Sequence, residues 1–248
     1  MNIPVALQLY SVRDEMQKDF IGTLGKVAGI GYKGVEFAGF GNIPAVQLRK
    51  VLADLGLAAA GSHTDIKLLT DKLDEVIEYN RTLGNKYIVC PYMSFESKED
   101  IVKASELFNK IGEKIRTNGM ELLYHNHSHE FKKFYDEYGL DLLYKGVKPE
   151  NMGAEFDTGW VFYSGVDPAE YIRSYKGRCP LIHVKDFTST DGMKFTEVGN
   201  GIVDVKGIAA AAAEAGARWL IVEQDECSMP SLESVGISFE NLKKMNLV

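Results

Sequence analysis

Histidines and carboxylates that follow short apolar segments are the most chemically informative residues of this 248-residue chain. All five histidines stand at such positions, together with several acidic residues and a lysine. The residues concerned are Glu36, His63, His125, His127, Glu155, Asp157, His183, Lys185 and Glu223. Imidazole nitrogen combined with carboxylate oxygen suits Mn²⁺, Co²⁺, Zn²⁺ or Fe²⁺ rather than a soft thiolate site. Converging carboxylates repel one another unless a cation neutralises them. These positions therefore favour a divalent-metal site.

Short apolar runs alternate with longer helical patterns along the whole chain. The predicted strands are 5–9, 34–37, 58–61, 87–90, 121–125, 153–156, 181–184 and 219–222. The predicted helices are 14–28, 43–55, 69–83, 98–117, 140–144, 168–175, 205–215 and 231–244. Eight strand–helix units of roughly 30 residues fit the βαβ repeat. We therefore predict an α/β fold, a (β/α)8 TIM barrel, as a single domain over residues 1–248. A doubly wound sheet is the alternative, but no GxGxxG turn follows the first strand.

In such a barrel the strand ends meet around one opening, where active sites lie. Side chains alternate along a strand, so His125 and His127 share a face if their strand continues that far. The same spacing relates Glu155 to Asp157 and His183 to Lys185. Each residue also has a purely structural interpretation. Asp157 is placed to cap a helix, Glu223 to pair with Lys185, and Glu155 to form a buried ion pair with Lys185. The joint pattern on consecutive strands favours a functional site.

The composition narrows the classes of function. The net charge is -7, and no run of lysines and arginines is present, which disfavours nucleic-acid binding. Three separate cysteines without a CxxC pair argue against disulfides and thiolate zinc sites. No secretory signal stands at the start, and no run of roughly 18 apolar residues could span a membrane. We therefore expect a cytoplasmic protein without membrane contact.

Seven motifs together resemble the xylose-isomerase-like TIM barrels, a superfamily that includes sugar-phosphate isomerases and epimerases. The motifs are LQLYSVRDEM at 7–16, GYKGVEF at 31–37, LLYHNHSHEF at 122–131, AEFDTGW at 154–160, HVKDF at 183–187, TEVGNGIVD at 196–204 and IVEQDE at 221–226. They are spread over the whole chain. They are specific for the superfamily and not for one reaction.

The resemblance implies one divalent metal, which is Mn, Co, Zn, Mg or Fe. Family members hold it with Glu, Asp, His and Glu from strands five to eight, and Asp157, His183 and Glu223 match the last three places. At the first place many relatives have Glu-Asn-His, whereas this chain has His125-Asn126-His127. We align His125 with the ligand glutamate. The alternative is a shifted strand from which Glu130 reaches the metal.

This departure bears on the reaction that the resemblance implies. Epimerase-type relatives use two metal-bound glutamates on opposite sides of the substrate, and here only Glu223 remains. We expect an isomerase or epimerase that removes a proton next to a carbonyl of a sugar or keto-polyol, with Glu223 as base and His127 or Lys185 handling a second proton. The alternative is a lyase or dehydratase acting on a 3-keto-sugar or keto-inositol. Related barrels of that kind have a similar Tyr-His-x-His strand end.

Four further residues are predicted to contact the substrate: Glu36, His63, Glu155 and Trp160. The indole would offer a flat apolar face to a sugar ring or an aglycone. Gly199-Asn200-Gly201 could present backbone N–H groups at the same opening. An abasic-site endonuclease and a non-catalytic sugar-binding barrel are the weaker alternatives. Exposed Met and Tyr residues are compatible with a homo-oligomer.

Overall fold

The computed structural model describes residues 3–248, and within them eight parallel strands close a barrel. The barrel strands are β1 (Val5–Gln8), β2 (Gly34–Phe37), β3 (Ala58–His63), β4 (Tyr87–Cys90), β5 (Glu121–His125), β8 (Gly153–Asp157), β9 (Leu181–Val184) and β12 (Trp219–Val222). Strand β1 pairs with both β2 and β12, which completes the ring. The predicted (β/α)8 architecture is confirmed.

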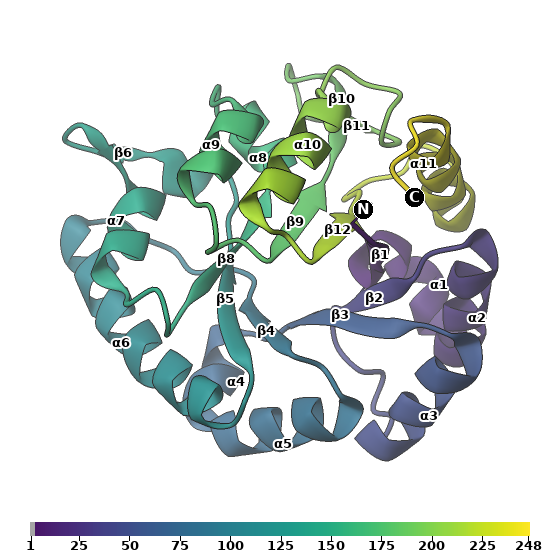
Figure 1. Cartoon of the computed structure of the whole chain (residues 1–248), viewed down its shortest axis with the longest axis horizontal. Helices are drawn as coiled ribbons and strands as arrows, with labels where there is room; N and C mark the ends of the chain where they lie inside the picture. The colour runs from purple at the N-terminus through teal and green to yellow at the C-terminus, as the bar shows by residue number, and fades with distance from the viewer. Residues whose placement is uncertain (1–2) are drawn as a thin grey trace.

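Helices form an outer ring around these strands (Figure 1). They are α1 (Arg13–Lys18), α2 (Phe20–Ile30), α3 (Ala45–Leu55), α4 (Ile66–Asp71), α5 (Leu73–Leu83), α6 (Lys98–Thr117), α7 (Gly139–Gly146), α8 (Thr158–Tyr163), α9 (Pro168–Ser174), α10 (Val205–Ala215) and α11 (Ser231–Lys244). Two 3-10 turns, η1 (Leu9–Val12) and η2 (His129–Phe131), follow β1 and β5. No helix within residues 3–248 combines the length and apolar character that a membrane span requires.

The buried apolar residues form two cores because alternate strand residues point to opposite faces. The larger core lies between the strands and the helices and includes Leu7, Val35 and Ile182. The smaller core fills the barrel interior. Its members are Ala6, Ala60, Tyr87, Val89, Leu123, Leu181 and Ile221. Polar residues two positions further along several of these strands point the same way, so a polar layer covers the inner core.

Two predicted helices are each divided in the structure. The helix expected over 14–28 is two helices, because Asp19 is extended and its carboxylate accepts a hydrogen bond from Gly22 N, which starts α2. The helix expected over 69–83 begins earlier and breaks at Lys72, which separates α4 from α5. Strands β3 and β8 continue further than predicted, to His63 and Asp157.

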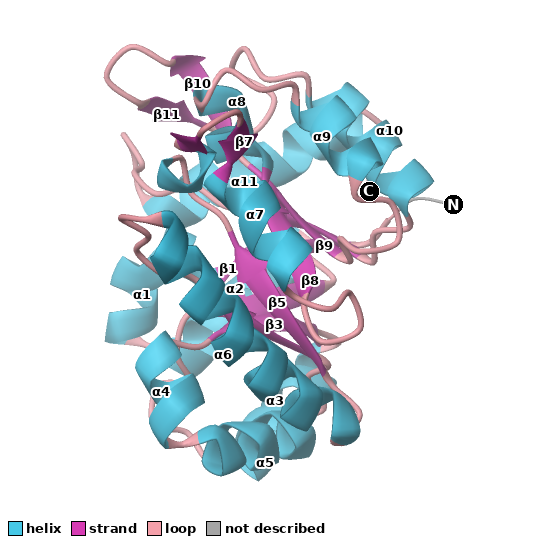
Figure 2. Ribbon diagram, turned by 90° about the vertical axis from the view of Figure 1, so that its left-hand side faces the viewer, coloured by secondary structure: helices cyan, strands magenta, loops and turns pink. Residues whose placement is uncertain are grey.

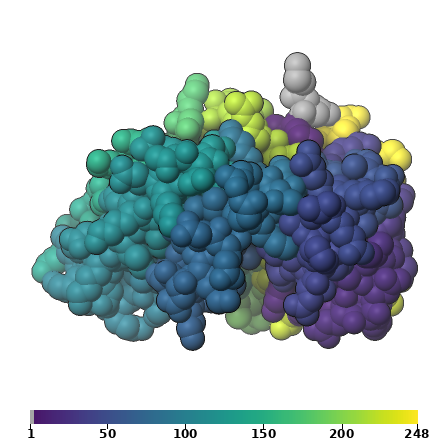
Figure 3. Space-filling view, turned by 90° about the horizontal axis from the view of Figure 1, so that it is seen from below, coloured from purple at the N-terminus to yellow at the C-terminus, as the bar shows by residue number. Residues whose placement is uncertain are grey.

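Two antiparallel hairpins extend the loops after β5 and β9. They are β6 (Lys133–Phe134) with β7 (Glu137–Tyr138), and β10 (Asp186–Ser189) with β11 (Lys194–Thr196). The β10–β11 hairpin projects at one end of the molecule (Figure 2). Seen from below, segments from the first half of the chain pack side by side along one continuous face (Figure 3). Neither hairpin was predicted from the sequence.

The packing of α6 gives a direct test of this arrangement. A Cβ atom added at Gly112 would overlap the backbone carbonyl oxygen of Asn151, whereas one added at Gly29 in α2 meets no atom within 4 Å. We expect Gly112→Ala to lower the free energy of unfolding by about 1–3 kcal/mol. Gly29→Ala, the matched control, should raise it by about 0.5–1 kcal/mol. Urea denaturation followed by circular dichroism measures both. Equal effects would contradict the close approach of α6 to the Asn151 loop.

Candidate active site

The register of the barrel brings the predicted residues of neighbouring strands into contact. His125 in β5 lies opposite Glu155 in β8, and Asp157 in β8 lies opposite His183 in β9. On the far side, Gln8 in β1 lies opposite Glu36 in β2 and donates a hydrogen bond to its carboxylate at 2.8 Å.

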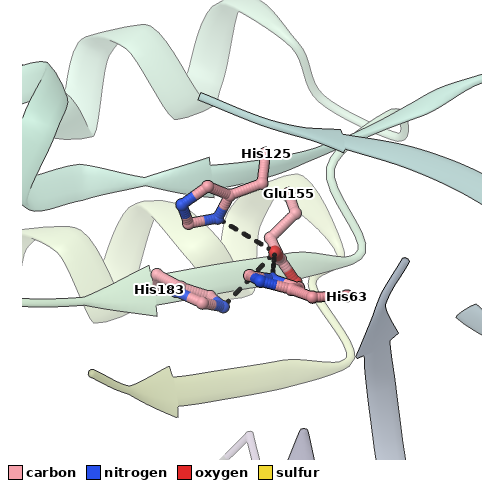
Figure 4. A group of neighbouring side chains, drawn as sticks. All are labelled: His63, His125, Glu155 and His183. Carbon is pink, nitrogen blue, oxygen red and sulfur yellow. Dashed lines mark hydrogen bonds and ion pairs between the residues drawn. The ribbon is translucent and has the colours of Figure 1, made fainter. Parts of the chain in front are cut away.

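The deeper part of the cluster is built around Glu155. Its Oε2 atom lies 2.7 Å from His63 Nε2, 3.0 Å from His125 Nδ1 and 3.3 Å from His183 Nε2 (Figure 4). Glu36 Oε2 completes this part at 2.6 Å from His183 Nε2. Glu36 and Glu155 are fully buried, and neither lines the pocket that opens above the cluster. Both carboxylates therefore face histidine rings.

These contacts fix the charges of the deeper groups. Burial opposes a charged imidazole, but Glu36 and Glu155 outweigh it and raise the pKa of His63 to about 10. The same balance raises the pKa of His183 well above its usual value. Burial would raise the pKa of Glu36, yet His63 and His183 bring that pKa well below its usual range. The deeper layer is thus a set of compensated ion pairs.

The upper part of the cluster contains the four predicted metal ligands. One ligand atom from each of His125, Asp157, His183 and Glu223 lies within 4.8 Å of the others, and all four residues are buried. His125 turns Nε2 toward Asp157 Oδ2, at 3.8 Å, and His183 turns Nδ1 toward Glu223 Oε2, at 2.9 Å. The opposite nitrogen of each ring faces Glu155 or Glu36. Each of the two histidines thus turns one ring nitrogen toward the upper cluster and the other toward a carboxylate of the deeper part, as in many metal sites.

The ammonium group of Lys185 lies among the upper carboxylates. Its Nζ atom is 2.8 Å from Asp157 Oδ2, 3.2 Å from Glu223 Oε2 and 2.8 Å from Asp225 Oδ2. Burial would lower the pKa of Lys185, but these three carboxylates raise it instead, so the group is charged. The pairing of Lys185 with Glu223 matches one sequence interpretation. Lys185 does not pair with Glu155, whose carboxylate faces the histidines.

The donor set fits a divalent cation. Asp157 uses Oδ1 to cap α8 at Trp160 N, while its buried Oδ2 faces the Lys185 ammonium at 2.8 Å. Burial would raise the pKa of Glu223, but Lys185 and His183 hold it well below its usual range, so this carboxylate is ionised. A second set, His63, His125, Glu155 and His183, is also close enough to hold a metal. That set contains one carboxylate, Glu155, whereas the upper set offers two, Asp157 and Glu223, and therefore more negative charge to a cation.

A pocket of about 680 Å³ opens above the cluster. Among the predicted site residues it is lined by His63, His125, His127, Trp160 and Glu223. Lys185 lies just beneath, with Nζ 4.9 Å from the centre of the Trp160 ring. The pocket therefore gives a ligand access to Glu223 and to three histidines at once.

His127 follows the end of β5 and reaches the pocket from the loop. Its Nδ1 atom is buried and has no hydrogen-bond partner among the described residues. Burial, reinforced by the charge of Lys185, lowers the pKa of His127 to about 4. The ring is therefore neutral near neutral pH and free to exchange a proton or a hydrogen bond with a ligand.

Two sequence alternatives are resolved by the loops. Glu130 does not reach the upper cluster, because its buried carboxylate accepts hydrogen bonds from Tyr124 Oη and from His127 N. The N–H groups of Gly199 and Gly201 do not face a ligand either, because both donate to Asp186 Oδ2. Glu130 positions His127, and Asp186 anchors the glycine loop.

Several residues of the pocket were missed by sequence reasoning, among them Asp225, Tyr92 and Phe195. Asp225 contacts Lys185 and lines the pocket. Tyr92 after β4 and Phe195 in β11 line the pocket as well. The spacing from Glu223 to Asp225 could have revealed Asp225, since alternate residues share a face while a strand continues. Tyr92 and Phe195 carry no comparable signal, because their loops have no regular period.

Known proteins resemble this chain in sequence and in fold. An inosose dehydratase from Lacticaseibacillus casei is 31% identical over 134 residues, which cover 47% of this chain and 44% of that protein. The chain thus matches less than half the length of that relative. A solved sugar phosphate isomerase/epimerase from Parabacteroides distasonis has a TM-score of 0.83 and 26% identity, over 100% of this chain and 96% of that one. A solved L-ribulose 3-epimerase, at 14% identity and a TM-score of 0.75 over 100% and 95% of the two chains, shares the fold. The model of the xylose isomerase-like TIM barrel family matches residues 24–245, and the chain belongs to that family.

Proposed function

We propose that this protein is a divalent-metal-dependent enzyme that removes a proton next to the carbonyl of a keto-polyol and then eliminates a neighbouring oxygen substituent. The observation behind the elimination is the position of His125. One nitrogen of its ring faces Asp157 in the upper cluster, and the other lies 3.0 Å from Glu155. With both nitrogens committed, His125 has no lone pair for proton transfer. The site therefore lacks the second metal-bound glutamate that epimerase-type relatives use for a symmetrical epimerisation.

The metal would be held by His125, Asp157, His183 and Glu223. When bound, a cation of the Mn, Co, Zn, Mg or Fe type supplies a Lewis acid that polarises the substrate carbonyl. Glu36 and Glu155 would hold the two ligand histidines in orientation, since each carboxylate accepts from the ring nitrogen that points away from the upper cluster. This role differs from the substrate contact expected from the sequence. His63 and Trp160 remain the proposed substrate contacts, because both line the pocket.

Glu223 is the proposed base. It is ionised, it lines the pocket, and its backbone follows the last barrel strand, so its position is rigid. As Glu223 takes the proton, the electron pair of the broken C–H bond forms a carbon–carbon double bond and the bond to the neighbouring oxygen breaks. Lys185, held between Asp157 and Glu223, keeps positive charge beside the carboxylates throughout.

His127 is better placed than Lys185 to relay a proton to the departing oxygen. Its neutral ring takes up one proton from water in the pocket as it gives one up, and Glu223 afterwards returns the proton it removed to the solvent. His127 lines the pocket with an unpaired Nδ1, whereas the Lys185 ammonium faces three carboxylates. The departing hydroxyl leaves as water, so the substrate loses one water molecule in total. If the proton returned to the same carbon instead, the enzyme would be an isomerase or epimerase, the class of the Parabacteroides distasonis relative.

The first test is solvent isotope exchange. A keto-inositol and a 3-keto-glucose are incubated with the protein and Mn²⁺ in deuterium oxide, and deuterium incorporation and loss of water are followed by NMR and mass spectrometry. We expect both for the unaltered protein. Glu223→Gln should reduce the rate by at least about a hundredfold. Glu226→Gln, which alters another glutamate of the pocket, is the control and should keep most of the activity. Full turnover by Glu223→Gln would exclude this residue as the base.

The second test separates proton removal from elimination. We expect His127→Ala to retain deuterium exchange while water loss falls by about a hundredfold or more. His129→Ala is the matched control, because His129 contacts the carbonyl oxygen of Met93 outside the cluster. Exchange with return of the proton and without water loss in the unaltered protein would establish an isomerase and reject the elimination.

The third test measures metal affinity directly. Replacing Glu36 by glutamine keeps its shape but removes the charge that faces His183 Nε2. We expect Glu36→Gln to weaken Mn²⁺ or Zn²⁺ binding by about 10- to 100-fold in titration calorimetry. Glu121→Gln, a surface change at a residue paired with Lys86, should have no effect. A protein that binds no divalent metal at all would favour a non-catalytic sugar-binding barrel.

A further inference from the structure

The pocket above the cluster has a polar floor and an apolar rim. His63, His125, Glu223 and Asp225 form the floor. The rim, which we call the apolar rim, consists of Tyr10, Leu68, Tyr92, Trp160, Met193 and Phe195. These six side chains come from segments after β1, β3, β4, β8 and β9. The fold therefore gathers apolar groups from separate loops around the one opening that leads to the reactive residues.

The exposure of the rim is unusual for this molecule. Within residues 3–248, ten large apolar side chains are exposed, and four of them are rim residues, from Met193 at 41% to Tyr92 at 51%. Single exposed apolar residues need no explanation, but several that converge on a hollow mark a binding site. A polyol alone would leave these side chains in water, because it has few apolar surfaces to cover them.

The aromatic groups of the rim stand beside the proposed proton donor. The ring centres of Tyr92 and Trp160 lie 5.6 and 5.7 Å from that of His127. Phe195 extends the surface, with its ring centre 6.0 Å from that of Trp160. A flat substituent on the polyol would therefore meet aromatic faces directly next to His127.

Arg13 holds the opposite part of the rim in place. Its guanidinium lies 4.1 Å from the centre of the Tyr10 ring and donates hydrogen bonds to Tyr10 O and Asp225 O. These contacts tie Tyr10 to the loop that bears Asp225. The rim is thus fixed relative to the floor, which favours a ligand that touches both.

We propose that the substrate is a keto-polyol bearing a planar aromatic substituent, with the polyol on the floor and the aromatic group against Tyr92 and Trp160. This inference rests on the proposed function and names its substrate class. The pocket volume of about 680 Å³ is that of a site for a drug-sized ligand, which is larger than one sugar ring. A second copy of the chain is a weaker occupant, because the rim surrounds a hollow whose floor contains the reactive groups.

Titration calorimetry with two unreactive probes tests the proposal. The Mn²⁺-loaded protein is titrated with 4-nitrophenyl β-glucoside and with methyl β-glucoside, neither of which has a carbonyl group. We expect the aromatic probe to bind at least about tenfold more tightly, and Tyr92→Ala to remove most of that preference. Tyr135→Ala is the matched control, since Tyr135 is 89% exposed and lies outside the pocket, and it should keep the preference.

Equal affinities, no binding of either probe, or a preference that survives Tyr92→Ala would overturn the proposal. So would a dimer that Tyr92→Ala converts to a monomer in sedimentation, because a second copy would then cover the rim. Isotope exchange into a 3-keto-glucose separates this inference from the proposed function. Deuterium exchange without tighter binding of the aromatic probe rejects the aromatic substituent and leaves the proposed function intact. An aromatic preference without exchange on any keto-polyol rejects the proposed chemistry and leaves the rim as a binding site.

Discussion

Charge compensation inside a closed barrel is the constraint on which the site depends. Four buried carboxylates, Glu36, Glu155, Asp157 and Glu223, point into a space from which bulk water is largely excluded. Such an arrangement is stable only when each negative charge has a partner. The histidines supply the partners in the deeper layer, and Lys185 supplies one in the upper layer. A divalent cation in the upper layer would meet the same requirement with greater charge. The proposed metal site and the compensation of the buried charges therefore depend on one electrostatic balance.

The two layers have different proposed roles: the deeper layer holds the histidines in orientation, and the upper layer contains the groups proposed to react. Groups of the deeper layer stand on barrel strands and are held by hydrogen bonds to one another and to Gln8, so their positions are fixed by the barrel itself. In the upper layer, His125 and His183 present their other ring nitrogens to the carboxylates of Asp157 and Glu223. Gly61 shows how tightly the deeper layer is packed, because a Cβ atom there would overlap the Glu36 carboxylate. The proposed substrate contacts, by contrast, stand on loops such as the one that bears Tyr92, which can vary without disturbing the floor.

The departure at His125 links this balance to the reaction. A glutamate in its place would add a fifth carboxylate and a second base to the cluster. Histidine instead adds a neutral ring, since burial and the nearby charged imidazoles of His183 and His63 hold the pKa of His125 well below its usual value. In place of a glutamate that could carry a proton, the cluster thereby has a histidine proposed to bind the metal. That replacement favours chemistry with one base on one side of the substrate.

The sequence by itself determined the strand–helix alternation, the barrel, and the residue types at the strand ends, because hydrophobic period and residue chemistry are local properties. It also identified His125, Asp157, His183 and Glu223 as one group, through the two-residue period of the strands and the family resemblance. Only the tertiary structure decided which nitrogen of each histidine faces which carboxylate, and that Glu36 and Glu155 lie beneath the pocket. It alone placed Tyr92 and Phe195 at the rim and turned Gly199 and Gly201 toward Asp186. Those facts depend on strand register and loop paths, which are set by packing between segments far apart in the chain.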